Sequence, residues 1–215
     1  ILASYSYVTA IALVPFGLLS DRVGYRRMLI AGLTLYTIAP LLYSLASNLP
    51  QLGFIRAFHG LAGAVFSPAA IALALDTSTQ DRWGEALGWF TTATQSALVV
   101  GPALGGLLLN HFGFNVAFYS CSIIPLLGLI FAIFRLNTIQ PATAKDVISS
   151  GDWSWLKQPA VFAGLTAPLF FTIGSGTILT FMPLHSQGLN IDETGAGIII
   201  ATVYIGSALL RVPGG

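Results

Sequence analysis

The charged residues of this chain are confined to a few short segments, and the stretches between those segments are long and apolar. The first charge is Asp21, none lies between Arg27 and Arg56, and 49 uncharged residues run from Ala86 to Phe134. An α-helix needs about 20 apolar residues to cross the hydrocarbon core of a membrane. The charge pattern therefore predicts a set of membrane-spanning helices joined by polar turns.

The composition agrees with this interpretation. Only 8% of the residues are charged and 55% are hydrophobic, whereas a soluble domain carries roughly 25% charged residues. The net charge of +1 comes without a basic patch, so the chain is not expected to bind nucleic acid. Its single cysteine cannot form an intramolecular disulfide. We expect an integral membrane protein in contact with lipid.

The polar segments divide the chain into seven apolar segments, each close to the length of a membrane span. Lipid leaves a spanning backbone only helices or closed barrels, and segments near 20 residues are twice the length of a barrel strand. The sequence therefore predicts an all-α fold. The predicted spanning segments are residues 1–19, 28–47, 51–75, two within 86–134 that are separated by a turn at 110–115, 159–183 and 195–210.

The basic residues predict the orientation of these segments. With the exception of Arg56, every lysine and arginine falls on one side of the predicted membrane, and the loops near residues 48–50, 110–115 and 184–194 contain none. By the positive-inside rule, the side that holds Asp21 to Arg27 is cytoplasmic.

Arg56 is the one basic residue inside an apolar segment. An intramembrane charge costs at least about 2.5–3.5 kcal/mol, so it normally faces a partner or a wet cavity. At 100° per residue, one helix face presents Arg56 together with His59, Gly60, Gly63 and Ser67. We interpret this face as a pathway for substrate or protons. The alternatives are that Arg56 extends its head group to the outer interface, and that His59 is a packing residue.

Small residues repeat at intervals of four in the segment 86–109. Ala97, Gly101 and Gly105 form a stripe that allows close helix approach in lipid, and Pro102 favours a kink. Ordinary helix packing is the alternative to a functional role. We find no metal-ligand cluster, nucleophile triad or phosphate-binding glycine loop, so we expect no cofactor, no bound metal and no enzymatic activity.

Three motifs resemble those of the major facilitator superfamily. Gly17-x-Leu-x-Asp21-Arg22-x-Gly24-x-Arg26-Arg27 resembles its motif A, which joins helices two and three. Arg56-x-x-His59-Gly60-x-x-Ala64 resembles motif B of helix four, with His59 where glutamine is usual. Ala97-x-x-x-Gly101-Pro102-x-x-Gly105-Gly106 resembles motif C of helix five in antiporters. Together they are most similar to the drug:proton antiporter group, which has twelve helices.

The resemblance implies a register for the chain. Val14-Pro15-Phe-Gly17 and Val212-Pro213-Gly-Gly215 are similar and lie six predicted spans apart, as in a fold of six-helix repeats. We expect a fragment that covers about helices two to eight and lacks most of the C-terminal half. Residues 1–135 would form the N-terminal bundle without its first helix, 136–157 a central cytoplasmic loop, and 158–215 the first two helices of the C-terminal bundle.

The resemblance also implies a function. Motif A would act as a cytoplasmic gate, with Asp76 as the acid of its charge relay and Tyr25 in place of the relay's arginine. We expect a secondary transporter in the cell membrane that exports a drug-like or amphiphilic molecule by proton-coupled alternating access. A sugar or metabolite symporter or uniporter is the alternative within the family, and a seven-span receptor is an alternative outside it.

Overall fold

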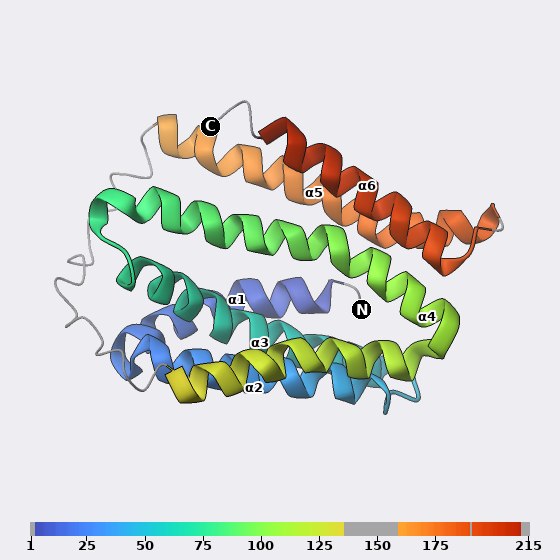
Figure 1. Ribbon diagram of the computed structural model, residues 1–215, viewed down its shortest axis with the longest axis horizontal. Coiled ribbons are helices and arrows are strands. Elements are labelled where there is room, and N and C mark those ends of the chain that lie inside the picture. The colour runs from blue at the N-terminus through green and yellow to red at the C-terminus, as the bar shows by residue number, and fades with distance from the viewer. Residues whose placement is uncertain (1–2, 136–158, 190, 212–215) are drawn as a thin grey trace. The chain divides into compact units, whose positions relative to one another are not determined.

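The computed structural model describes residues 3–135, 159–189 and 191–211, and this part of the chain consists of helices joined by short turns (Figure 1). Each of the seven predicted segments overlaps one of its helices, although the predicted segment 28–47 runs four residues past the end of α2, and the predicted all-α fold is confirmed. The helices are α1 (Ser4–Val23), α2 (Tyr25–Tyr43), α3 (Leu49–Asp76), the short 3-10 helix η1 (Gln80–Arg82), α4 (Trp83–Arg135), α5 (Pro159–Gly188) and α6 (Glu193–Arg211).

The contacts divide the chain into two compact units. The first comprises Ile1–Ala97 with His111–Ala142, and the second comprises Leu98–Asn110 with Thr143–Gly215. The division falls inside α4 as well as after it, whereas the sequence predicts one boundary after residue 135. The predicted division into bundles therefore stays a prediction, and each unit is described by itself below.

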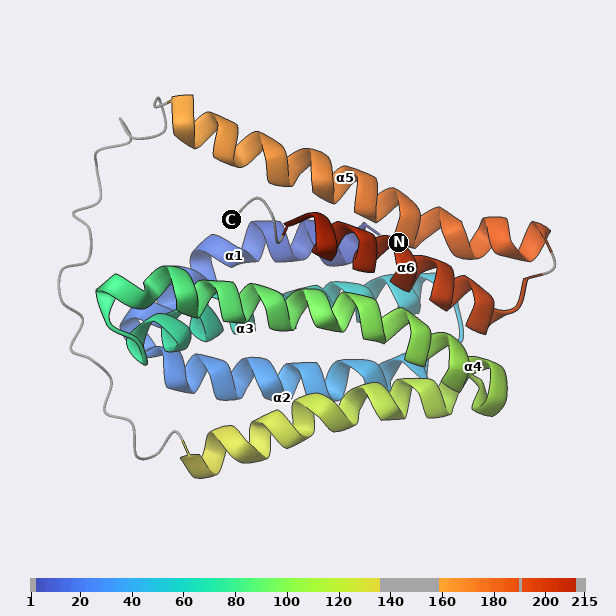
Figure 2. The ribbon, with the colours of Figure 1, turned by 45° about the horizontal axis from the view of Figure 1, so that its top comes forward.

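In the first unit, α3 packs against both α1 and α2 (Figure 2). The contact surface of α3 is built from small residues, because Gly60, Ala62, Gly63 and Ala64 are all buried. The buried core around Met28 and Leu29 also includes Val65, Ala69, Ala70 and Ala132. Small side chains let helix backbones approach closely, which is how helices associate in lipid without a hydrophobic driving force between them.

The turns between these helices are formed by residues with the expected conformational preferences. Gly24 adopts φ 93°, a left-handed value that favours glycine, and it joins α1 to α2 within one residue. The Asn48 side chain caps α3 by accepting a hydrogen bond of 2.9 Å from the Gln51 backbone N–H. The sequence therefore specifies both turns locally.

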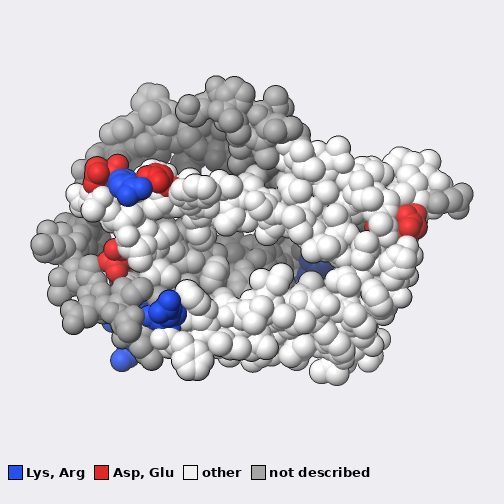
Figure 3. Space-filling model, in the orientation of Figure 1, with Lys and Arg blue, Asp and Glu red and all other residues white. Residues whose placement is uncertain are grey.

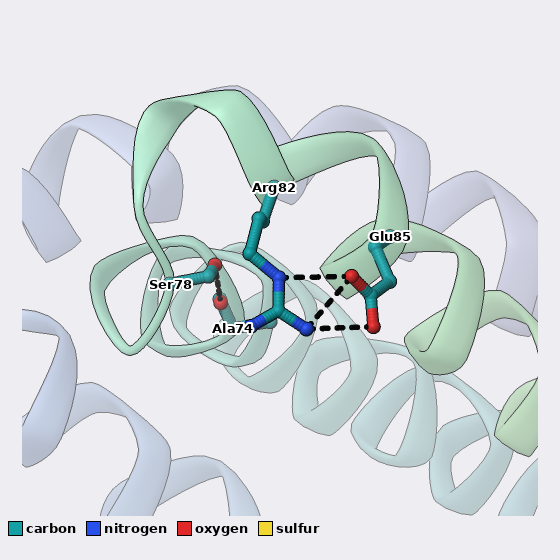
Figure 4. Close-up of polar contacts among 4 residues, drawn as sticks. All are labelled: Ala74, Ser78, Arg82 and Glu85. Carbon is teal, nitrogen blue, oxygen red and sulfur yellow. Dashed lines mark hydrogen bonds and ion pairs between the residues drawn. The ribbon is translucent and has the colours of Figure 1, made fainter.

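The turn between α3 and α4 is the charged one drawn in Figure 4. The Arg82 Nε donates to a Glu85 carboxylate oxygen at 2.9 Å, and its Nη2 donates to the other at 3.0 Å. The Ser78 hydroxyl donates to the Ala74 carbonyl at 2.8 Å. Both side chains of the ion pair are exposed, so the pair contributes under about 1 kcal/mol. Its main significance is that it marks a hydrated turn.

The helix α4 is interrupted at Gly113, which has φ 79° and ψ 174°. A continuous helix of 53 residues would be about 80 Å long, far more than the roughly 30 Å of a hydrocarbon core. The break lies within the predicted turn at 110–115, so that prediction is confirmed. Glycine is suited to this position because the left-handed φ is strained for other residues.

Large apolar side chains cover much of the surface. Ile11, Ile124 and Phe134 are each 74–75% exposed, and soluble proteins rarely present wide apolar patches. In Figure 3, few acidic or basic atoms are seen, and most of the surface that is drawn in white carries no charge. By length and composition, Leu49–Asp76 and Gln80–Arg135 can cross a membrane. The number of spanning helices stays a prediction.

Candidate functional site

His59 lies among three tyrosines in the first unit. Its ring meets the rings of Tyr5 and Tyr36 edge-on at centroid distances of 5.4 Å each, and that of Tyr43 at 5.9 Å. The Tyr43 hydroxyl and the His59 Nδ1 are 3.3 Å apart, within hydrogen-bond distance. The hydroxyls of Tyr5 and Tyr36 are 3.4 Å apart. Three helices thus place four polar aromatic side chains in one cluster, here called the His59 cluster.

Gly60 and Gly63 allow α1 to approach α3 beside this cluster. A Cβ atom on Gly60 would touch the Tyr5 carbonyl oxygen, and one on Gly63 would lie 2.9 Å from the Tyr5 hydroxyl. The Thr9 hydroxyl lies 2.9 Å from the Gly60 carbonyl and 2.8 Å from the Tyr5 carbonyl, and it can donate to either. The structure therefore gives these glycines a packing role. A pathway role for them stays a prediction.

Arg56 lies one helical turn from His59 and lines a cleft of about 750 Å³. The cleft is bounded by the C-terminal end of α2, the first turns of α3 and the part of α4 that follows Gly113. The Arg56 Nε is buried and has no hydrogen-bond partner among the described residues. His59 lines the same cleft, whereas the half-buried Ser67 lies two turns further along α3 and outside it. Of the predicted face, Arg56 and His59 therefore line the cleft, and Ser67 does not.

The motif A residues occupy the junction of α1 and α2. Asp21, Arg22 and Arg27 are exposed, while Arg26 is half-buried and its Nε has no partner in the described part of the chain. A Cβ atom on Gly17 would meet nothing within 4 Å, so no close approach occurs there among the described residues. Among these motif A residues, Gly24 is the one whose structural role is clear from the described residues, because it forms the turn.

Tyr25 connects this junction to the end of α3. Its hydroxyl donates to the Asp76 Oδ2 at 2.6 Å, across 51 residues of sequence. Asp76 is the acid that the resemblance places in the charge relay, and Tyr25 stands where the relay's arginine is expected. A neutral donor therefore contacts the predicted acid in place of a cation. Partial burial, together with this hydrogen bond and the Asp76 charge, raises the Tyr25 pKa to about 12.

A Tyr25→Phe variant is expected to lose this contact and about 1 kcal/mol of stability, because Asp76 is half-buried and loses its donor. The ordinary tyrosine pKa is 10, so the contribution of the pair is complete below pH 10 and declines as the pH rises towards 12. Tyrosinate absorbance during alkaline titration measures the pKa of Tyr25. The absorbance of the wild type minus that of the variant is expected to rise in a step near pH 12. A step near pH 10 would contradict the contact.

The motif C residues lie in α4, and two of them, Pro102 and Gly106, closely approach α6 within the second unit. A Cβ atom on Gly106 would touch the Glu193 carbonyl oxygen, and one on Gly197 would touch the Pro102 carbonyl oxygen. By contrast, Gly101 and Gly105 have nothing within 4 Å of an added Cβ atom, and Ala97 is exposed. Only part of the predicted stripe is therefore in close contact in the described chain.

Several residues of these sites were missed by the sequence interpretation. Tyr36 and Tyr43 are seven residues apart, which places them 20° apart on one helix face, and that spacing was a usable signal. Tyr5 gave no comparable signal. Gly197 was also missed, because it lies in α6 and the sequence does not indicate that α6 contacts Pro102.

Comparisons with known proteins identify the family. The whole chain, residues 1–215, matches the sequence model of the Major Facilitator Superfamily. It is 30% identical over 209 residues to multidrug resistance protein MdtG of Salmonella arizonae, which is 96% of this chain and 50% of that protein. A similar protein of the same name from Klebsiella pneumoniae is 28% identical over 96% of this chain and 49% of its own length.

An uncharacterized transporter of the same superfamily from Methanocaldococcus jannaschii is 24% identical over 98% of this chain and 56% of its own length. The chain thus spans about half the length of the curated relatives it matches. Since the family match extends over all 215 residues, the chain belongs to the major facilitator superfamily, an all-helical family of integral membrane transporters.

Proposed function

We propose that the protein containing this chain is a secondary transporter that exports a small amphiphilic molecule in exchange for protons. The observation that carries the proposal is Arg56, a cation inside an apolar segment that lines a cleft together with His59. Intramembrane charges of this kind mark substrate or ion pathways. The relatives named as multidrug resistance proteins support export of a drug-like compound.

The mechanism we propose is alternating access, in which one bundle of helices moves against the other around a site near the membrane midplane. In the described part of the chain, the acids lie at helix ends or in turns rather than in the middle of a helix. His59 is therefore the proton-binding candidate that this chain offers. Its contact with the Tyr43 hydroxyl gives it a defined orientation from which a proton could be exchanged.

The contact between Tyr25 and Asp76 would contribute to gating at the cytoplasmic end. It joins the first turn of α2 to the last turn of α3, so it holds these two ends together while it is formed. Motif A would use this contact as part of its gate. The Gly106 and Gly197 contacts would set the close approach of α4 and α6 on which motif C depends.

The test is transport by the full-length gene product that contains this sequence. Everted membrane vesicles would be energised to an acidic interior, and a panel of fluorescent amphiphiles and sugars would be added. Exchange is expected to release protons from the vesicles when an amphiphile is added, and a protonophore is expected to abolish amphiphile uptake. Uptake of sugars alone, or uptake of amphiphiles that persists with the protonophore, would overturn proton-coupled export.

The proposed orientation predicts a labelling pattern. A cysteine at the exposed Thr79, in a Cys121→Ser background, is expected to react with a membrane-impermeant maleimide only from the cytoplasm. A cysteine at the exposed Ser47, in the turn at the other end of α3, is the matched control and is expected to react only from outside. Mass-shift labelling in intact cells and in everted vesicles measures both. The reverse pattern would show that the proposed orientation is wrong.

A further inference from the structure

The cleft beside Arg56 carries a positive charge without a negative one. Apart from Arg56, its lining contains aromatic, aliphatic, hydroxyl, thiol and amide side chains and His59, and none of the described lining residues is acidic. The Arg56 Nε is buried and lacks a partner in the described chain. The described acids lie at helix ends or in turns, so none of the described residues gives Arg56 a counter-charge in this cleft, and a bound anion would supply one.

The chemistry of the guanidinium group indicates what that ligand carries. Arginine presents a planar fork of N–H donors that matches the two oxygens of a carboxylate, or those of a sulfonate or phosphate. Asn115 also lines the cleft, and its side-chain amide carries N–H donors. The polar part of the cleft is thus suited to an anion.

Three aromatic side chains, Tyr43, Phe118 and Phe114, also line the cleft. The Tyr43 and Phe118 rings are stacked with centroids 5.1 Å apart and planes at 17°, and those of Phe118 and Phe114 are 6.3 Å apart at 25°. These rings give the cleft an apolar, aromatic lining against which an aromatic body can pack. The volume of about 750 Å³ is that of a pocket for a drug-sized molecule.

We propose that this cleft binds a small amphiphilic organic anion, with its acid group on Arg56 and its aromatic body against Tyr43, Phe118 and Phe114. The proposal rests on the proposed function, because it names the charge class of the transported molecule. A site that selects lipophilic cations would instead be expected to have a carboxylate at the position of the Arg56 guanidinium.

The experiment compares two probes of the same shape and different charge. Naphthalene-2-carboxylate and its uncharged carboxamide would be titrated against the full-length protein in nanodiscs of phosphatidylcholine, with binding followed by calorimetry. Wild type is expected to bind the carboxylate at least about tenfold more tightly than the carboxamide, as a charge-assisted hydrogen bond would provide. The ratio is expected to fall to about one in Arg56→Gln and to an intermediate value in Arg56→Lys.

Arg82→Gln is the matched control, because Arg82 is exposed and paired with Glu85, so its loss is expected to leave the ratio unchanged. If Arg56→Gln does not fold, the decrease in Arg56→Lys decides the question. A ratio near one in wild type, or an unchanged ratio in the Arg56 variants, would overturn the proposal. Loss of carboxylate binding when phosphatidylglycerol replaces part of the lipid would assign the site to a lipid headgroup and would also overturn it.

Because binding is measured without a proton gradient, it is independent of turnover. Proton-coupled transport of amphiphiles by a protein with no charge preference would leave the proposed function intact and refute the anion site. A charge preference in a protein that moves no substrate would refute export instead.

Discussion

Replacing Arg56 by alanine is expected to reduce transport by about 10- to 100-fold while the protein still inserts into the membrane. The expected size follows from the loss of one hydrogen-bonded interaction to a charged group, worth about 1.5–3 kcal/mol. Insertion is expected to survive because removing a charge from an apolar segment favours its place in lipid. Initial rates of amphiphile uptake into everted vesicles, normalised to the amount of inserted protein, measure the effect.

Two further variants separate the charge of Arg56 from its shape. Arg56→Lys is expected to retain partial activity, since it keeps the positive charge but loses the planar fork of donors. Arg82→Ala, which removes an exposed cation at the cytoplasmic turn, is expected to transport at the wild-type rate. Transport by Arg56→Ala at the wild-type rate would assign Arg56 to the outer interface and would remove the main support for a substrate pathway.

The sequence was most informative where the cause of a structural feature is local. The polar segment around Gly113 predicted the break in α4, because uncharged runs longer than a membrane span must turn and glycine tolerates a positive φ. The charged segment from Asp21 to Arg27 predicted a polar turn between α1 and α2, and Gly24 supplies its positive φ. The shared face of Arg56 and His59 also followed from sequence, since helix geometry alone determines which residues of one helix face the same way.

Features that join different helices could not be predicted in the same way. The hydrogen bond between Tyr25 and Asp76 spans 51 residues and requires knowledge of which helix ends meet. Without that knowledge, Tyr25 was only a departure from a motif. The three tyrosines around His59 come from α1 and α2, and nothing in the α3 sequence indicates them.

The small-residue stripe shows a second limit. Spacing alone treats Gly101, Gly105 and Gly106 alike, yet only Gly106 closely approaches another backbone in the described chain, where the first residues of α6 pass it. A stripe of small residues allows another helix to approach closely. It does not determine at which of these residues the other helix approaches, because that depends on the path of that helix.

Gly60→Val is expected to have the largest effect on stability of any single substitution considered for this chain. A Cβ atom at Gly60 would touch the Tyr5 carbonyl oxygen and lie 3.0 Å from the Tyr5 Cα, and a backbone obstacle cannot rotate aside. The helix α1 would therefore have to move away from α3, and Thr9 would lose its contact with the Gly60 carbonyl. We expect a loss of about 3 kcal/mol or more.

The glycines of this unit provide a graded control for that prediction. At Gly63 the obstacle is the Tyr5 hydroxyl, the end of a flexible side chain, so Gly63→Ala is expected to cost about 1 kcal/mol. At Gly128 an added Cβ atom would lie 3.5 Å from the Leu33 Cδ2, an ordinary contact, so Gly128→Ala is expected to be neutral or stabilising by up to about 1 kcal/mol. Unfolding midpoints in detergent measure all three. Equal midpoints for Gly60→Val and Gly128→Ala would show that α1 does not approach α3 at Gly60, whereas the graded order would locate the contact that holds the His59 cluster together.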